Sequence, residues 1–242
     1  MRVLILGGTA EARELADRLV ALRHDVITSL AGRTSRPMLP AGALRVGKFG
    51  GVPGLVGYMS AMGIERLVDA THPYAGLISV NAVAAGRQAG IPLVRLMRAE
   101  WVEPDDARWS HVPDIGAAAR ALPAGCHALV TTGHEGLEQL LARADCTFVV
   151  RLIEPPAEAL PRHARLLLDR PPYSLEDERA LLRREEIGVL VSKNSGGEQT
   201  AAKVAAAREL GIGVIMVDRP AYGPAVEVAT VDAAIEALHL GT

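Results

Sequence analysis

The chain has 242 residues, a formal net charge of −2 and 49% hydrophobic residues. A chain of this length and apolar fraction can bury one large core or two ordinary ones, which excludes a disordered protein, and the lack of a basic excess argues against a nucleic-acid-binding protein. No apolar run approaches the ~20 residues of a membrane-spanning helix, and the N-terminus enters an apolar strand without a basic leader, so we expect a cytoplasmic protein that does not bind membranes.

The first predicted element is a short apolar run, Val3 to Leu6, which is typical of a buried parallel strand. Gly7 and Gly8 follow at once, and a helix is predicted from about residue 10, because apolar residues then recur at spacings of three and four. Such a corner can hold a diphosphate on backbone N–H groups at the positive end of the helix dipole. Thr9 and Ala12 replace the second and third glycines of G-x-G-x-x-G, so the residues alone favour a nucleotide loop and a plain turn equally.

A second strand is predicted over Asp25 to Leu30, and its end bears on the choice of nucleotide. In NAD-binding proteins of this type an acidic residue at that position grips the ribose 2'-hydroxyl. This strand instead leads into Ser29, Arg33 and Thr34, whose hydroxyls and guanidinium suit a 2'-phosphate, so the pattern favours NADPH. The alternative interpretation is a solvated surface arginine.

A glycine-containing loop follows in the segment "RVGKFGG", residues 45 to 51. Gly50 and Gly51 would allow this loop to lie over a flat cofactor. A flexible connection between two elements explains the composition equally well.

The third strand, Leu67 to Asp69, runs directly into Ala70, Thr71, His72, Pro73 and Tyr74. This order predicts hydroxyl, imidazole and phenol groups at the carboxyl edge of the sheet, beside the expected nicotinamide. The alternative is a structural histidine.

Further short apolar runs alternate with helical segments, which predicts parallel sheets covered by helices. We expect strands at residues 93–95, 129–131, 148–152, 166–168, 189–191 and 214–217. The polar stretch Trp101 to Pro113, broken by two prolines, indicates a boundary. The predicted fold is therefore α/β, with two doubly wound Rossmann/flavodoxin-like domains over residues 1–100 and 101–242 and ligands bound in a cleft between them.

A second glycine turn is predicted in the second half of the chain, where a strand ends in Ser192 and Lys193 and leads into Asn194, Ser195, Gly196 and Gly197. A helix is expected from about Glu198. Backbone N–H groups at this turn would hold an anion, and Lys193, one of only three lysines, would add a full positive charge. A capped helix with a surface lysine is the alternative.

Several other kinds of site are not indicated. Cys126 and Cys146 have no C-x-x-C spacing, so we expect buried thiols and no disulfide framework. The seven histidines are scattered, which predicts no metal site, and neither G-x-S-x-G nor a P-loop G-K-[ST] occurs.

The motifs taken together resemble one family, the precorrin-6A reductases of cobalamin biosynthesis. The resemblance covers residues 1 to about 220 and rests on "ILGGTAEAREL", "SLAGRT", "GKFGG", "DATHPYA", "RLMRAEW", "RLIEPP", "SKNSGG" with the following "AAKVAAARELGI", and "VDRP". Lys48 departs from the glycine expected before "FGG", and Tyr74 stands where phenylalanine is also familiar.

This resemblance implies an enzyme that uses NADPH to reduce one ring double bond of precorrin-6A, a polycarboxylated tetrapyrrole, giving precorrin-6B. The N-terminal domain would bind NADPH, the C-terminal domain would bind the tetrapyrrole, and the protein would be a monomer or weak homodimer. Lys193 is the first candidate for proton donation or charge stabilisation, and His72 or Tyr74 is the second. The predicted cofactor-binding residues are Gly7, Gly8, Thr9, Ala10, Glu11, Ser29, Arg33, Thr34, Gly50, Gly51, Asp69, Ala70, Thr71, His72 and Pro73. The predicted substrate-binding residues are Tyr74, Arg95, Arg98, Trp101, Thr132, Gly133, Arg151, Lys193, Asn194, Ser195, Gly196 and Gly197.

Three alternatives remain open at the level of the sequence. The substrate could carry cobalt, as in the anaerobic branch. The chain could be an NAD(P)H oxidoreductase for a smaller carbonyl compound, although no tyrosine has a lysine four residues on. A dinucleotide sensor or scaffold would need the cofactor corner but not the second glycine turn.

Overall fold

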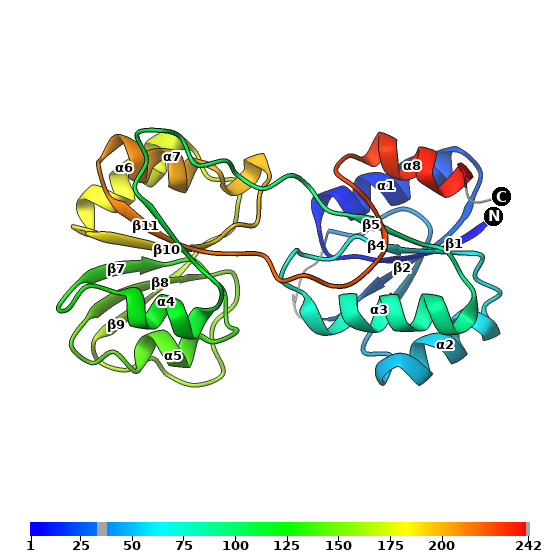
Figure 1. Ribbon diagram of the computed structural model, residues 1–242, viewed down its shortest axis with the longest axis horizontal. Helices are drawn as coiled ribbons and strands as arrows, with labels where there is room; N and C mark the ends of the chain where they lie inside the picture. The colour runs from blue at the N-terminus through cyan, green and yellow to red at the C-terminus, as the bar shows by residue number, and fades with distance from the viewer. Residues whose placement is uncertain (33–37, 241–242) are drawn as a thin grey trace. The chain divides into compact units, whose positions relative to one another are not determined.

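The computed structural model describes residues 1–32 and 38–240 and divides the chain into two compact units (Figure 1). The first unit comprises Met1–Ala99 together with Pro220–Thr242, and the second is Glu100–Arg219. The expected boundary near residue 100 lies where the chain first leaves one unit for the other. The expected range 101–242 for the second domain is wrong at its C-terminal end, because residues from 220 onward add a strand and a helix to the first unit.

The first unit is a six-stranded parallel sheet with helices on both faces. Its elements are β1 (Arg2–Leu6), α1 (Ala10–Ala21), β2 (Asp25–Leu30), β3 (Ala43–Val46), α2 (Gly51–Ala61), β4 (Arg66–Asp69), α3 (Gly76–Ala89), β5 (Leu93–Leu96), β12 (Val226–Val228) and α8 (Val231–Leu240).

The apolar run of β1 fills both cores of this unit, because successive side chains of a strand point to opposite faces. Val3 and Ile5 pack in the cluster with α1 and α8, whereas Leu4 and Leu6 pack in the cluster with α2 and α3. Figure 1 shows these two helix pairs on opposite faces of the sheet. The continuous apolar pattern of β1 therefore reflects burial on both sides.

The second unit is also a six-stranded parallel sheet between helices. Its elements are β6 (Trp109–Val112), α4 (Ile115–Ala121), β7 (His127–Val130), α5 (Leu137–Leu141), β8 (Thr147–Leu152), β9 (Ala164–Leu168), α6 (Leu175–Arg184), β10 (Val189–Lys193), the 3-10 helix η1 (Glu198–Thr200), α7 (Ala202–Glu209) and β11 (Gly213–Val217). The predicted α/β class with two doubly wound domains is confirmed.

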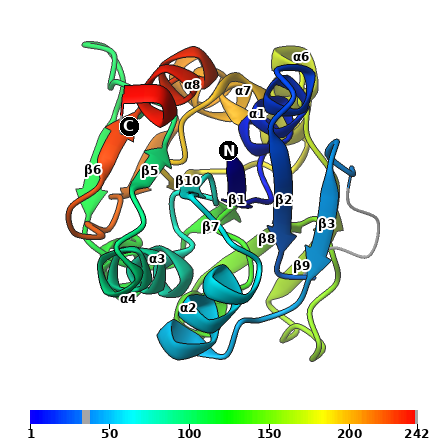
Figure 2. The same cartoon turned by 90° about the vertical axis from the view of Figure 1, so that its right-hand side faces the viewer.

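Each sheet contains a switch point, where the direction of winding reverses. The strand orders are β12-β5-β4-β1-β2-β3 and β6-β11-β10-β7-β8-β9. Figure 2 shows β1, β2 and β3 side by side in this order. The reversal falls between β1 and β4 in the first sheet and between β7 and β10 in the second. In doubly wound folds the carboxyl ends of the strands at this point are where ligands bind.

Three strands were not expected from the sequence, and all three lie at sheet edges. β3, β6 and β12 are three or four residues long and largely exposed, so they lack the apolar run that marks a central strand. β6 lies inside the stretch that was expected to be a polar boundary segment.

The two cysteines are closer together than their separation in sequence indicates. Cys146 is buried and Cys126 is half-buried, and their Sγ atoms lie 3.4 Å apart because the residues precede the paired strands β7 and β8. Both are free thiols. No helix within the described ranges is long and apolar enough to cross a membrane.

Candidate cofactor and substrate sites

Gly7 and Gly8, which form the corner after β1, each occupy a position that favours glycine, for different reasons. A Cβ atom on Gly7 would lie 2.8 Å from Thr28 Cγ2, and Gly8 has a φ of +122°, which L side chains rarely adopt. Thr9 caps α1, since its Oγ1 accepts from Ala12 N at 3.1 Å and donates to the Ala70 carbonyl at 2.9 Å. The corner therefore presents a capped helix N-terminus at the switch point of the first sheet, a geometry suited to a diphosphate.

The predicted 2'-phosphate residues are described only in part. Ser29 is buried at the end of β2, and its carbonyl accepts a hydrogen bond from Gly7 N at 2.9 Å, which joins the β2 end to the glycine corner. Arg33 and Thr34 lie outside the described residues. Gly50 and Gly51 both have a φ of +83° at the start of α2, so this loop requires glycine for its backbone conformation.

The turn after β4 has polar groups with defined partners. Asp69 is 2% exposed, and its Oδ1 accepts from Thr71 N at 3.2 Å and from Thr71 Oγ1 at 2.7 Å. His72 is exposed and its Nδ1 accepts from Tyr74 N at 3.3 Å, while Tyr74 itself is buried. The carbonyl groups of Ala70 and Pro73 accept hydrogen bonds from Thr9 Oγ1 and Tyr222 Oη. His72 is thus the group of this turn that is accessible for proton transfer.

Arg95, which the sequence predicts as a substrate-binding residue, is buried within the first unit. Its side chain is 1% exposed, with Nε 3.6 Å from Asp69 Oδ2 and Nη1 2.6 Å from Glu227 Oε1. Nη1 also donates to the Gly223 carbonyl at 3.1 Å, and Tyr222 Oη donates to the Pro73 carbonyl at 2.6 Å. The C-terminal return segment therefore fastens β5 and the β4 turn together. Sequence reasoning missed Tyr222 because nothing near residue 222 indicates that the chain has returned to the first sheet.

Two further predicted residues of the first unit pair with each other. Arg98 Nη1 lies 3.0 Å from Glu11 Oε2 and 3.2 Å from Oε1, and Glu11 is in the first turn of α1. A residue predicted to bind substrate and one predicted to bind cofactor are therefore brought together at the glycine corner. Ala10 is the first residue of the same helix.

In the second unit, four consecutive polar residues at the end of β10 are buried, namely Ser192, Lys193, Asn194 and Ser195. Lys193 is 9% exposed and its Nζ lies 3.8 Å from Glu135 Oε2. β10 is a central strand of its sheet, so this polar run stands at the switch point. Gly196 and Gly197 both have positive φ and complete the turn.

Trp101 is held against this turn by hydrogen bonds from its backbone and its indole ring. Its backbone N–H donates to Asn194 Oδ1 at 2.9 Å, and Asn194 Nδ2 donates back to the Trp101 carbonyl at 3.1 Å. The indole Nε1 donates to the Gly197 carbonyl at 2.9 Å, and Lys203 Nζ lies 4.8 Å from the ring centroid. Sequence reasoning missed Lys203, whose place on a helix gave no signal of contact with Trp101.

The end of β7 supplies the other side of the second switch point. Thr132 is 4% exposed, and its Oγ1 has no hydrogen-bond partner within the part of the chain that the structure describes. Gly133 follows with a φ of +81°. A buried hydroxyl without a partner is costly, so Thr132 is a candidate for contact with a ligand.

Arg151 has a structural partner in place of the predicted substrate carboxylate. Its Nη1 lies 2.8 Å from Glu178 Oε1, and both side chains are buried. The guanidinium also lies 4.0 Å from the ring centroid of Tyr173. Burial raises the pKa of Tyr173 to about 12 despite the opposing charge of Arg151. As with Arg95, the guanidinium is paired with a carboxylate of its own unit.

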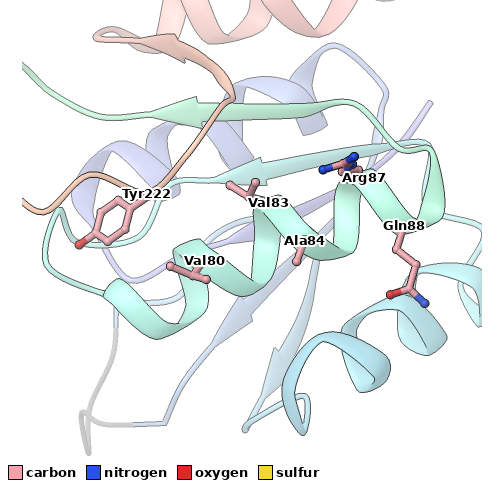
Figure 3. Close-up of a pocket in the computed structure, with 6 residues that line it drawn as sticks. All are labelled: Val80, Val83, Ala84, Arg87, Gln88 and Tyr222. Carbon is pink, nitrogen blue, oxygen red and sulfur yellow. The ribbon is translucent and has the colours of Figure 1, made fainter.

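A surface pocket of about 530 Å³ lies on α3 and involves none of the predicted site residues (Figure 3). It is lined by Val80, Val83, Ala84, Arg87, Gln88 and Tyr222. A second pocket, around Gly116 and Arg143, involves none of these predicted residues either. Among the described residues, no three His, Cys, Asp or Glu side chains gather as metal ligands.

The chain has two doubly wound parallel sheets, each with glycines and polar groups at its switch point. This arrangement is typical of α/β proteins that bind nucleotides. A family model described as "Precorrin-6x reductase CbiJ/CobK" matches residues 2–239, and the chain belongs to this family. The chain is 46% identical over 233 residues to precorrin-6A reductase of Rhodococcus erythropolis, covering 96% of this chain and 93% of that one. It is 42% identical to precorrin-6A reductase of Rhodobacter capsulatus, covering 91% and 88%.

A solved structure agrees with these sequence relatives. The structure entitled "CobK precorrin-6A reductase" has a TM-score of 0.93 and 40% identity, and the match covers 99% of this chain and 96% of that one. The family membership confirms the resemblance drawn from the motifs and the predicted class of activity, an oxidoreductase that reduces a precorrin.

Proposed function

We propose that the chain catalyses the NADPH-dependent reduction of precorrin-6A to precorrin-6B in cobalamin biosynthesis. The binding of NADPH is supported by the glycine corner at the β1–β4 switch point, where Gly8 has a φ of +122° and Thr9 caps α1. The family membership supports the substrate part. When bound, NADPH supplies the hydride that adds to one carbon of the ring double bond.

The first unit is the proposed NADPH-binding domain. Gly7, Gly8 and the first turn of α1, including Ala10 and Glu11, would hold the diphosphate, and the β2 end with Ser29 would lie at the adenosine ribose. Arg33 and Thr34 stay predictions for the 2'-phosphate. The β4 turn from Ala70 to Pro73 would border the nicotinamide, since it shares the switch point with the glycine corner.

The second unit is the proposed tetrapyrrole-binding domain. Its polar groups at the β7 and β10 ends suit the acetate and propionate groups of such a substrate: Lys193 offers a cation, Thr132 a buried hydroxyl, and Gly133, Gly196 and Gly197 close backbone approach. Arg95 and Arg151 are left out of this set, because both are buried and ion-paired within their units.

Reduction of a double bond also needs a proton at the second carbon. Lys193 is the proposed donor or charge-stabilising group, because its ammonium is held within a nearly buried strand end. His72, which is exposed at the β4 end, is the alternative, with Tyr74 as its buried neighbour. Either residue would act by holding a proton at a defined nitrogen.

The direct test is an anaerobic assay of the purified chain with precorrin-6A or cobalt-precorrin-6A and with NADPH or NADH. The proposal predicts turnover of metal-free precorrin-6A with NADPH, followed as loss of reduced nicotinamide and identified as precorrin-6B by mass. Turnover of the cobalt form alone would assign the chain to the anaerobic branch. No turnover with either form would contradict the proposal.

A further inference from the structure

Arg45 is a charged residue that stands next to the proposed adenosine corner and that the sequence-based site did not include. β3 pairs with β2 in parallel, and Arg45 is the direct register partner of Ser29. Arg45 Nη1 lies 3.3 Å from Ser29 Oγ. Because Ser29 also binds Gly7 through its carbonyl, Arg45 is connected to the glycine corner through one residue.

The guanidinium of Arg45 is held in a fixed orientation. Nη1 donates to the Gly47 carbonyl at 2.5 Å and Nη2 to the Lys48 carbonyl at 2.8 Å. Its central carbon lies 3.7 Å from the ring centroid of Phe49 and 5.2 Å from that of Tyr58, so the planar group is stacked as well as hydrogen-bonded. An oriented planar fork suits a phosphate better than a flexible surface cation does.

The positive charge of Arg45 is not balanced locally. Arg95 and Arg151 each contact carboxylates, whereas no ion pair of Arg45 occurs among the described residues. Residues 26–64 contain no Asp or Glu at all, including the stretch 33–37, but contain Arg33, Arg36, Arg45 and Lys48, which is four positive charges in a chain whose net charge is −2. A half-buried guanidinium in a stretch of sequence without acidic residues favours an anionic ligand.

We infer that Arg45 recognises the adenosine 2'-phosphate of NADPH and thereby sets the preference for NADPH over NADH. The inference rests on the proposed function, because it requires a dinucleotide at the glycine corner. In doubly wound domains the residue at the end of the second strand faces the adenosine ribose, and an arginine nearby accommodates a 2'-phosphate. Ser29 follows Gly7 by 22 residues and occupies that strand end, so its register partner is correctly placed for this role.

The test is a set of binding measurements by titration calorimetry without turnover, using NADPH, NADH, 2',5'-ADP and 5'-AMP. Arg45→Met should weaken binding of NADPH and 2',5'-ADP by roughly ten- to a hundredfold, as expected for a lost charge-assisted contact, and leave NADH and 5'-AMP within about twofold of the wild type. Arg45→Lys should give an intermediate loss for the 2'-phosphorylated ligands, because it keeps the charge but not the fork. Arg87→Met, on the exposed surface of α3, is the matched control and should change none of the four affinities.

The comparison of ligands separates recognition from folding. An equal loss for all four ligands would show that Arg45 only supports the structure of its loop, and unchanged affinities would remove it from the site; either result overturns the inference. If the wild-type chain binds neither NADPH nor NADH, the proposed cofactor function itself fails. If the wild type prefers NADPH and Arg45→Met retains that preference, the proposed function stands and only the role of Arg45 is refuted.

Discussion

Lys193 is the residue whose placement bears most directly on chemistry. Its side chain ends a buried strand, and its Nζ lies 3.8 Å from Oε2 of Glu135, which is exposed. A nearly buried ammonium at a strand end can interact with charge that develops on a substrate. The lysine itself was evident from the sequence, because it precedes a glycine turn, but its burial was not.

Lys193→Met should lower kcat by about 100-fold or more with little change in KM, if the ammonium acts only as the double bond is reduced. Lys193→Arg keeps the positive charge but cannot release a proton at neutral pH, so it should recover activity if charge stabilisation is the role and not if proton donation is. Steady-state kinetics with precorrin-6A measure both. A raised KM at unchanged kcat would instead indicate that Lys193 binds a substrate carboxylate.

Gly8 tests whether the first corner is more than a turn. Gly8→Val should cost ~1–3 kcal/mol of stability because of its φ of +122°, and it should abolish NADPH binding because a branched side chain would stand where the diphosphate approaches. Gly63→Val is a useful control, since Gly63 also has a positive φ, of +59°, and open space around it, but lies between α2 and β4. It should lose stability and keep NADPH affinity in calorimetry. Normal NADPH binding by Gly8→Val would place the diphosphate elsewhere.

At the level of elements, the return segment from residue 220 to β12 holds the β4 turn through one hydroxyl. Tyr222→Phe should remove the 2.6 Å hydrogen bond to the Pro73 carbonyl while keeping the ring beside Arg95. The expected cost is ~0.5–1.5 kcal/mol of stability, with faster hydrogen exchange at residues 74–75. Tyr173→Phe, which removes a hydroxyl contact to the Asp169 carbonyl in the other unit, should leave exchange at that turn unchanged. Equal exchange in both variants would show that Tyr222 does not hold the turn.

The second unit should lose stability at alkaline pH. Burial, with a hydrogen bond to Cys146 as the second cause, raises the pKa of the Cys126 thiol from 9.0 to about 12, and burial raises that of Tyr173 from 10.0 to about 12. Both groups are therefore neutral in the folded state at pH values where they ionise in the unfolded chain. Their contribution to the free energy of unfolding is complete below about pH 9 and is lost as pH rises toward 12. Urea unfolding at a series of pH values measures this loss. The double variant Cys126→Ala and Tyr173→Phe should show a flatter profile between pH 9 and 12, and an unchanged slope would contradict the assignment.

The parts that could be predicted from the sequence are those whose signal is local. Central strands such as β1 and β10 are buried on both faces and therefore read as apolar runs, and glycine turns follow them directly. The short edge strands β3, β6 and β12 could not be predicted, because exposure removes their pattern. For the same reason the partners of Arg95 and Arg151 could not be foreseen: a guanidinium at a strand end has the same sequence signal whether it meets a ligand or a buried carboxylate from a distant element.

For the whole molecule, the feature that the sequence concealed is the return of the chain to its first sheet. β12 pairs with β5, and α8 packs beside α1 on the core cluster of Val3 and Ile5. Val231, Ala234 and Leu238 supply that contact. The motif signals of the second unit continue up to residue 217, so nothing before β12 marks the crossing.

A chain ending at Arg219 should therefore fail to keep its first unit folded, although every residue up to 99 is present. It would lose Val231 and Leu238 from the core, each worth ~1.5–3 kcal/mol of burial, as well as Glu227, the 2.6 Å partner of the buried Arg95. Added together, these losses approach the 5–15 kcal/mol that stabilises a typical domain. Limited proteolysis should digest residues 1–99 while 100–219 resists, because the second unit is continuous in sequence. A chain ending at Arg219 that resists proteolysis throughout and binds NADPH normally would show that β12 and α8 are dispensable for the first sheet.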